Sequence, residues 1–283
     1  HYIDMTWLKS MSEQEKNMKK KVVALSIAAA LMATLILSPL GAYGVSLAAM
    51  SVYSHMESED SYMTQKGIEI EMPSGDGWYP FVMTFNADEG FASFSGGEAR
   101  KLTIMYNFPE FDLKKGCSRL YDDSSPYYSS FYGAYCVEGD YGFDEDGNLK
   151  VEEAGRVPQY DYTKLVLRDL GLPVENQVFR WQTAGVSEGV ELAGYEGWTR
   201  VDASLTVNGV LHEKEEFLRN YIQYGSPGYD TEENFAPVNM VGRVYGRYFE
   251  EEDAGIYFYI ITADPGVLDE WDKEILRESK IVK

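Results

Sequence analysis

A long apolar segment near the N-terminus constrains this chain more than any other feature. No Asp, Glu, Lys or Arg occurs at positions 22–56, and residues 22–37 are almost entirely Val, Ala, Leu, Ile and Met. As a helix, residues 22–43 would span roughly 33 Å, enough for a bilayer core of about 30 Å. Lysines at 19–21 precede the segment, and such lysines stay on the cytoplasmic side. The sequence therefore predicts a transmembrane helix at 22–44, with everything after it outside the cytoplasm.

Two interpretations of this segment are open. If translation starts at Met18, the segment is a secretory signal peptide with small-residue cleavage sites near 44–48, and the product is secreted. If residues 1–21 are a cytoplasmic tail, then 22–44 is a single-pass signal anchor in the cell membrane. The length of the apolar run favours the anchor, because a typical signal peptide has an apolar core of roughly 7–15 residues.

The composition excludes several classes of function. Asp and Glu outnumber Lys and Arg by 46 to 25, which gives a net charge of −21. Such a surface repels nucleic acids. The chain has three His and two Cys, too few and too widely spaced for a zinc cluster. We therefore expect no nucleic-acid partner and no cofactor.

Alternation of apolar and polar residues dominates after a polar linker at 45–66. The pattern predicts strands at 68–72, 79–85, 102–108, 198–207, 238–249 and 256–262. Asn208-Gly209 is the preferred pair for a two-residue hairpin turn. An acidic turn at 250–255 separates the last two strands, which predicts a second hairpin.

Signals for helices are fewer. Asp161 stands where it could cap a short helix ending near Leu170, and residues 213–222 are a weaker candidate. Asp264 followed by Pro265 opens an amphipathic C-terminal helix with an N-cap and a first-turn proline. A mostly antiparallel sheet with two or three helices makes residues 67–283 an α+β domain, preceded by one transmembrane helix.

The end of the chain resembles two known groups of proteins. A strand at 256–262, followed by an amphipathic helix that ends in Arg277-Glu278-Ser279-Lys280-Ile281, is similar to the ending of PsbP-like domains. It also resembles the extracytoplasmic domains of membrane-bound sigma-factor regulators of Gram-positive bacteria, in which a tail such as 7–21 feeds a single span. The resemblance implies a ligand-sensing or scaffold domain and transfers no functional residue.

The segment between the two cysteines has an unusual composition. In an oxidising compartment Cys117 and Cys136 could form a disulfide worth about 3 kcal/mol; the alternative is two free, buried thiols. Tyrosine with Ser and Gly is typical of adaptable recognition surfaces. This predicts a loop that binds a ligand or partner, unless the rings instead pack over a sheet. The tyrosines of the segment are Tyr121, Tyr127, Tyr128, Tyr132 and Tyr135.

The acidic stretch at 142–153 is a candidate calcium-binding loop. Aligned with an EF-hand loop, Asp144, Asp146 and Glu153 take ligand positions, but Gly142 stands at the first position, where a carboxylate is required. The alternative is a tight acidic turn between strands, since Asp-Gly is a hairpin signal.

Two further motifs do not support catalysis. Residues 185–189 match G-x-S-x-G, but no helix follows as a nucleophile elbow requires. His212 lacks the second histidine of a zinc-protease motif.

Three residues of one predicted strand face, Arg243, Tyr245 and Arg247, could bind an anion or pair with nearby acids.

The sequence as a whole favours a membrane-anchored extracytoplasmic binding or sensing module without catalytic activity, which contacts an extracellular ligand or a cell-envelope component. Two alternatives are a membrane-bound signalling or sigma-factor regulator and a cell-envelope enzyme acting on glycan or peptide.

Overall fold

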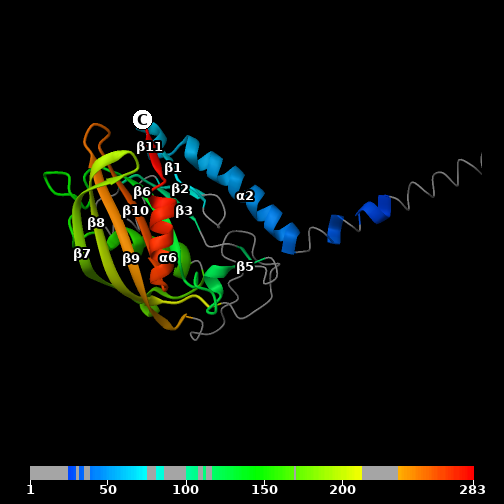
Figure 1. Ribbon diagram of the computed structural model, residues 1–283. Coiled ribbons are helices and arrows are strands. Elements are labelled where there is room, and N and C mark those ends of the chain that lie inside the picture. Colours follow the sequence, from blue (N-terminus) through cyan, green and yellow to red (C-terminus); the bar gives the residue numbers. More distant parts are fainter. Residues whose placement is uncertain are drawn as a thin grey trace, which may run out of the picture.

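The centre of the structure is a seven-stranded antiparallel sheet with strand order β2-β3-β6-β10-β9-β8-β7 (Figure 1). Its strands are β2 (Phe81–Phe85), β3 (Leu102–Asn107), β6 (Phe131–Glu138), β7 (Phe179–Leu192), β8 (Tyr195–Asn208), β9 (Pro237–Phe249) and β10 (Ala254–Thr262). Two small sheets pair β1 (Glu69–Glu71) with β11 (Lys280–Val282) and β4 (Phe111–Asp112) with β5 (Cys117–Ser118). The predicted α+β class with mostly antiparallel strands is confirmed.

This computed structural model describes residues 25–29, 32–34, 39–74, 81–85, 100–107, 111–112, 117–168, 170–211 and 235–283. Residues 25–29 and 32–34 are helical. The further α-helices of the described residues are α2 (Pro39–Glu59), α3 (Tyr62–Gln65), α5 (Arg156–Asp161) and α6 (Pro265–Trp271). Two of them continue as π-helical segments, α5 into η2 (Tyr162–Arg168) and α6 into η6 (Asp272–Leu276). Short 3-10 turns are η1 (Arg119–Tyr121) and η3 (Val174–Asn176).

Both faces of the central sheet are covered, as Figure 1 shows with α6 on one side and α5 on the other. The strand β10 lies in the middle of the sheet, and every residue in it is buried. Its odd-numbered residues, such as Tyr259, pack into the core formed with α5 and η2. Its even-numbered residues, such as Phe258, pack into the core formed with α6 and α3. Two-sided burial explains why β10 is a continuous apolar run.

The C-terminal helix forms as predicted. Asp264 is its N-cap, and the carboxylate accepts a hydrogen bond from the backbone N–H of Gly266 at 2.7 Å. The apolar stripe of α6 and η6 is buried against the sheet: Val267, Leu268, Trp271, Ile275 and Leu276. Burial of this stripe stabilises the helix, since an isolated helix of this length is marginal in water.

The prediction that Asp161 caps a helix is wrong. The helix begins earlier, at Arg156, and Asp161 is its last residue, with a fully buried side chain. The segment from Asp161 onward keeps its apolar side chains in the same core, for example Val166 and Leu170. The sequence pattern therefore predicted the apolar face correctly but not the residue at which the helix begins.

The predicted two-residue hairpin at Asn208-Gly209 is also wrong. Asn208 lies inside the sheet, opposite Pro237 of β9. Its side-chain amide donates to the carbonyl of Phe235 at 2.9 Å and accepts from the backbone N–H of Val178. Asn208 therefore ties three segments together instead of turning the chain. The residues that follow, 212–234, lie outside the described part of the chain, and they include His212 and the weaker helix candidate at 213–222.

Much of the predicted linker at 45–66 is helical, in α2 and α3. The helix α2 packs against the edge strand β2, where the hydroxyl of Ser54 accepts a hydrogen bond from the backbone N–H of Val82 at 3.0 Å. The carboxylate of Glu57 accepts from the backbone N–H of Thr84 at 2.9 Å. Side chains of α2 thus satisfy donors that an open sheet edge would leave exposed.

Part of the predicted transmembrane segment, at 22–24, 30–31 and 35–38, lies outside the described residues. Within the residues that the structure does describe, we find no helix with the length and apolar character needed to cross a membrane.

Candidate functional site

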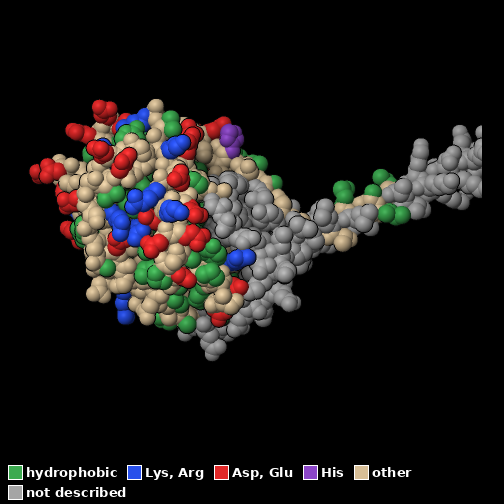
Figure 2. Space-filling view, in the orientation of Figure 1, with side chains coloured by type: hydrophobic (Ala, Val, Ile, Leu, Met, Phe, Trp, Pro, Cys, Tyr) green, Lys and Arg blue, Asp and Glu red, His purple; other side chains and the backbone are tan. Residues whose placement is uncertain are grey.

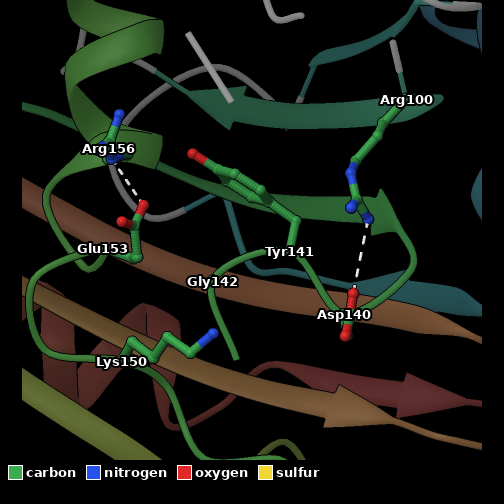
Figure 3. A pocket seen from close by; sticks show the side chains of 7 residues that line it. All are labelled: Arg100, Asp140, Tyr141, Gly142, Lys150, Glu153 and Arg156. Atoms are coloured by element: carbon green, nitrogen blue, oxygen red, sulfur yellow. Dashed lines mark ion pairs between the residues drawn. The ribbon is translucent and has the colours of Figure 1, made fainter. Parts of the chain in front are cut away.

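A polar cavity of about 370 Å³ opens beside the turn that follows β6 (Figure 3). Among the residues that the structure describes, its lining contains three cationic side chains, two acidic side chains and one phenol. These residues are Arg100, Asp140, Tyr141, Gly142, Lys150, Glu153 and Arg156. An excess of cations in one cavity is notable because the whole chain carries a net charge of −21.

Arg100 is held on one side of the cavity by the backbone of the turn. One of its terminal nitrogens donates to the carbonyl of Glu138 at 2.9 Å and lies 3.8 Å from the carboxylate of Asp140. Gly139 has a φ of 77°, and a Cβ atom there would lie 2.5 Å from the Arg100 guanidinium. The positive φ favours glycine at this position, and a larger residue would also displace the end of the Arg100 side chain.

Lys150 reaches the cavity through a second turn. The backbone N–H of Lys150 donates to the carbonyl of Gly142 at 2.8 Å, which closes the segment between them. Within that segment, Phe143 and Leu149 form an antiparallel bridge. The backbone of Lys150 is therefore fixed, whereas its side chain is exposed to solvent.

The segment that leads into α5 lines another side of the cavity. The Nε of Arg156 lies 2.6 Å from the carboxylate of Glu153. These two side chains are three residues apart and form a salt bridge at the start of the helix. Glu153 and Arg156 stand on one side of the Tyr141 ring, and Arg100 and Asp140 stand on the other (Figure 3).

Tyr141 lies between these charged groups. Its side chain is mostly buried, and burial, together with the negative charge of Glu153, raises the pKa of Tyr141 to about 12. The phenol is therefore neutral at physiological pH. The guanidinium of Arg100 lies 5.8 Å from the centre of the ring, within the range of a cation–π contact.

The arrangement is suited to binding an anion. Lys150 has no salt bridge or side-chain hydrogen bond within the described residues, whereas the two arginines each pair with an acid of the lining. Two pairs plus one ammonium without a pair give the described lining residues a formal charge of +1. Charge-assisted hydrogen bonds from such groups are the strong ones in anion recognition.

No local pattern in the sequence predicts this cavity. Arg100, Asp140 and Arg156 lie far apart in the chain, and no spacing rule links them. A partial signal was present in the glycines at 139, 142 and 147, all of which have positive φ angles. They mark tight turns in the segment that carries Asp140 and Lys150.

The tyrosines proposed as a recognition surface are mainly core residues. Tyr121, Tyr132 and Tyr135 are each at most 1% exposed, and they lie in the cores on the two faces of the sheet. Tyr127 is half-buried, with its ring stacked on Trp271 at 5.7 Å. Packing of alternate β6 residues into the two cores explains the burial of Tyr132 and Tyr135.

Tyr128 is half-buried, like Tyr127. Its hydroxyl lies against Gly209, where a Cβ atom would be 2.5 Å away. Binding of a ligand by these two rings stays a prediction.

Cys136 is a free thiol in the structure, buried in β6. Burial raises the pKa of Cys136 to about 12, which keeps the thiol protonated and unreactive. The side chain of Cys117 lies outside the described residues. No disulfide is present in the part of the chain described, and the predicted bridge between the two cysteines stays a prediction.

The acidic stretch proposed for calcium forms a tight turn. The carboxylate of Asp144 accepts from the backbone N–H groups of Asp146 and Asn148, at 3.0 and 2.8 Å. Glu153 is directed to Arg156 instead. Among the described residues, no group of three His, Cys, Asp or Glu side chains is arranged to hold a metal ion. Asp144, Asp146 and Glu153 are therefore not gathered into a calcium site.

The proposed anion spot on β9 is occupied by acids of the protein. Arg243 is 7% exposed and lies 2.6 Å from the carboxylate of Asp202 and 2.9 Å from that of Asp272. Tyr245 donates to Asp272 at 2.7 Å. Figure 2 shows Lys and Arg side chains mixed with acids over this face. Arg247 differs, since its guanidinium lies over the rings of neighbouring aromatic residues.

The G-x-S-x-G motif lies on β7, an edge strand whose residues are largely exposed. Ser187 pairs with Arg200 of β8, so the motif forms part of a hairpin and not the strand-to-helix turn of a nucleophile elbow.

Comparisons of this chain with protein-family models, with curated proteins and with solved structures find no match.

Proposed function

We propose that this chain is a membrane-anchored extracytoplasmic module that binds a small ligand, from the extracellular space or the cell envelope, in the polar cavity around Tyr141. The module binds this ligand without converting it to a product. Residues 22–44 act as the anchor, with residues 1–21 in the cytoplasm. The location rests on the lysines before the apolar run.

The main support for the binding role is the arrangement of charged side chains in the cavity. Arg100 precedes β3, Lys150 and Arg156 lie in the segment that leads into α5, and all three line one space of about 370 Å³. Such a volume lies within the usual range for small-molecule sites, about 300–1,000 Å³. A hydrogen bond to the Glu138 carbonyl holds the Arg100 side chain, a salt bridge to Glu153 holds Arg156, and a backbone hydrogen bond to Gly142 fixes the main chain of Lys150. Groups held in place before a ligand arrives lower the entropy cost of binding.

A second function, signalling across the membrane, is supported by the contact between α2 and β2. Ser54 and Glu57 of α2 accept hydrogen bonds from two backbone N–H groups of β2. The helix begins at Pro39, inside the predicted anchor. A change in the domain could therefore alter how this helix enters the membrane, as the signalling-regulator alternative requires.

A ligand screen tests the binding role. The full chain, purified in detergent, is mixed with separate small polar compounds: amino acids, neutral sugars, sugar acids, short glycan fragments and phosphate esters. We expect at least one class to raise the melting temperature, because a ligand that binds only the folded state stabilises it. The Arg156→Ala variant removes a cavity cation and should reduce that shift.

Mass spectrometry of the recovered ligand distinguishes binding from catalysis. An unchanged ligand supports a binding module, and a converted ligand supports the cell-envelope enzyme instead. A screen without any stabilising compound contradicts the binding role.

A further inference from the structure

We propose that the ligand of the cavity around Tyr141 is a small hydroxylated monocarboxylate, the chemistry of a sugar acid, with its carboxylate bound by Lys150. This inference rests on the proposed binding function and specifies its ligand. It follows from the charge, the unused hydrogen-bonding groups and the volume of the cavity.

The charge of the cavity selects an anion. Arg156 is paired with Glu153 at 2.6 Å, and Arg100 is paired loosely with Asp140 at 3.8 Å. Lys150 has neither a salt bridge nor a side-chain hydrogen bond within the described residues. In Figure 3 its ammonium points into the space between the two pairs. One carboxylate at this position neutralises the formal charge of +1 that the described lining residues carry.

The cavity also offers hydrogen-bond acceptors, which a simple anion would not use. The carboxylate of Asp140 is 71% exposed, and its distance of 3.8 Å from Arg100 is too long for a hydrogen bond. An ionised carboxylate only accepts hydrogen bonds. A ligand that carries hydroxyl groups beside its own carboxylate therefore supplies donors to Asp140 and negative charge to Lys150.

The volume favours a molecule larger than a single ion. A space of about 370 Å³ is many times larger than one water, whose share of liquid volume is about 30 Å³. Phosphate or acetate would leave most of this space filled with water. The Asp140 and Lys150 side chains are exposed to solvent, which suits a hydrophilic ligand.

The test uses four compounds with the same six-carbon skeleton and different charge. These are D-gluconate, an anion; D-glucitol, which is neutral; D-glucamine, a cation; and D-glucosaminate, a zwitterion. Their binding to the full chain in detergent is measured by isothermal titration calorimetry at low ionic strength. We expect D-gluconate to bind most tightly, and its affinity to fall as salt is added.

Two variants locate the binding. Lys150→Met removes the ammonium with little change in side-chain length, and it should weaken D-gluconate binding on the order of tenfold to a hundredfold. Lys273→Met is the matched control, because Lys273 is 80% exposed on η6 and does not line the cavity. It removes the same charge and should leave the affinity unchanged. Equal melting temperatures of the two variants show that both are folded.

The outcomes separate this inference from the proposed function. Equal binding of D-glucitol and D-gluconate, or tighter binding of D-glucosaminate, overturns the monocarboxylate but keeps the cavity as a binding site. An equal loss of affinity in both variants places the ligand elsewhere and overturns the role of Lys150. If all four compounds fail while another class in the ligand screen binds, the inference is wrong and the binding function stands. If nothing binds in either experiment, both are wrong.

Discussion

The hydroxyl of Tyr259 donates a hydrogen bond to the carboxylate of Asp161, which lies 98 residues earlier in the chain. Tyr135 donates to the same carboxylate. Asp161 is the last residue of α5, and its side chain is fully buried against the sheet. Burial raises the pKa of Asp161 to about 7, even though both hydrogen bonds lower this pKa. A carboxyl group in the core therefore links the helical layer to two central strands.

This relationship predicts how stability depends on pH. The pKa of Asp161 rises from about 4 in the unfolded chain to about 7 in the folded state. The protonated form is favoured by folding, so its stabilisation is fully present below about pH 4 and is lost as the pH rises through about 7. In Asp161→Asn, which cannot ionise, this loss should be absent.

Urea denaturation of both proteins from pH 4 to pH 8 provides the measurement. The stability of Asp161→Asn relative to the parent should increase across this range, by at most about 1.4 kcal/mol per pH unit. The exposed Glu175→Gln variant serves as the control for loss of one charge. A difference between Asp161→Asn and parent that stays constant with pH would contradict the assignment.

Removal of the Ser54 hydroxyl should detach α2 from β2 locally. Ser54 is 6% exposed and accepts from the backbone N–H of Val82. Ser54→Ala leaves that buried donor without a partner, at a cost of about 1–3 kcal/mol. Ser51→Ala, on the exposed side of the same helix, is the matched control. Hydrogen exchange at the Val82 amide should accelerate in Ser54→Ala alone; unchanged exchange would show that the contact is not maintained in solution.

Replacement of a β6 tyrosine tests whether the tyrosine-rich segment is structural. Tyr132 is 1% exposed, and its ring meets Trp271 edge-on with 4.8 Å between centroids. Tyr132→Ala should cost about 3–5 kcal/mol, as for other large-to-small changes of buried aromatic residues. Val174→Ala, at a site 69% exposed, should stay within about 0.5 kcal/mol. Thermal denaturation measures both, and equal losses would mean that Tyr132 is not a core residue.

Neutralisation of Arg243 should destabilise the sheet strongly. Its guanidinium lies between the carboxylates of Asp202 and Asp272, and the Asp272 side chain is 7% exposed. Arg243→Met removes one cationic partner of the buried Asp272, which keeps Arg277 at 3.1 Å and the Tyr245 hydroxyl at 2.7 Å. The cost should therefore be at most about 3–5 kcal/mol, the range for a fully broken buried pair. Arg180→Met, on the exposed strand β7, removes a surface cation as a control. Urea unfolding that gives equal midpoints for both variants would refute the role of Arg243.

The topology of the chain is tested in cells. A reporter that is active only outside the cytoplasm, fused after Lys283, should be active because the lysines at 19–21 precede the apolar run. Membrane association that resists carbonate extraction would support the anchor at 22–44. A soluble secreted product beginning near residues 44–48 would show cleavage instead, and an inactive reporter would contradict both interpretations.

Local patterns in the sequence determined much of the strand layout. Alternation at Ile68, Ile70 and Met72 predicted β1, and all three side chains are buried. The Asp264 cap predicted the start of α6, because a cap depends on residues two or three positions apart. Such features are confirmed because their physical causes act between near neighbours in the chain.

Tertiary structure decided the rest, because it depends on which distant segments meet. Asp161 could cap a helix or enter the core, and only its contact with Tyr135 and Tyr259 selects the core. Burial of the tyrosines follows from a sheet covered on both faces, which no local pattern reveals. The cavity required Arg100, Asp140 and Arg156 to converge around Tyr141. Sequence alone fixes the chemistry that each side chain carries, whereas long-range packing decides which of those groups face one another.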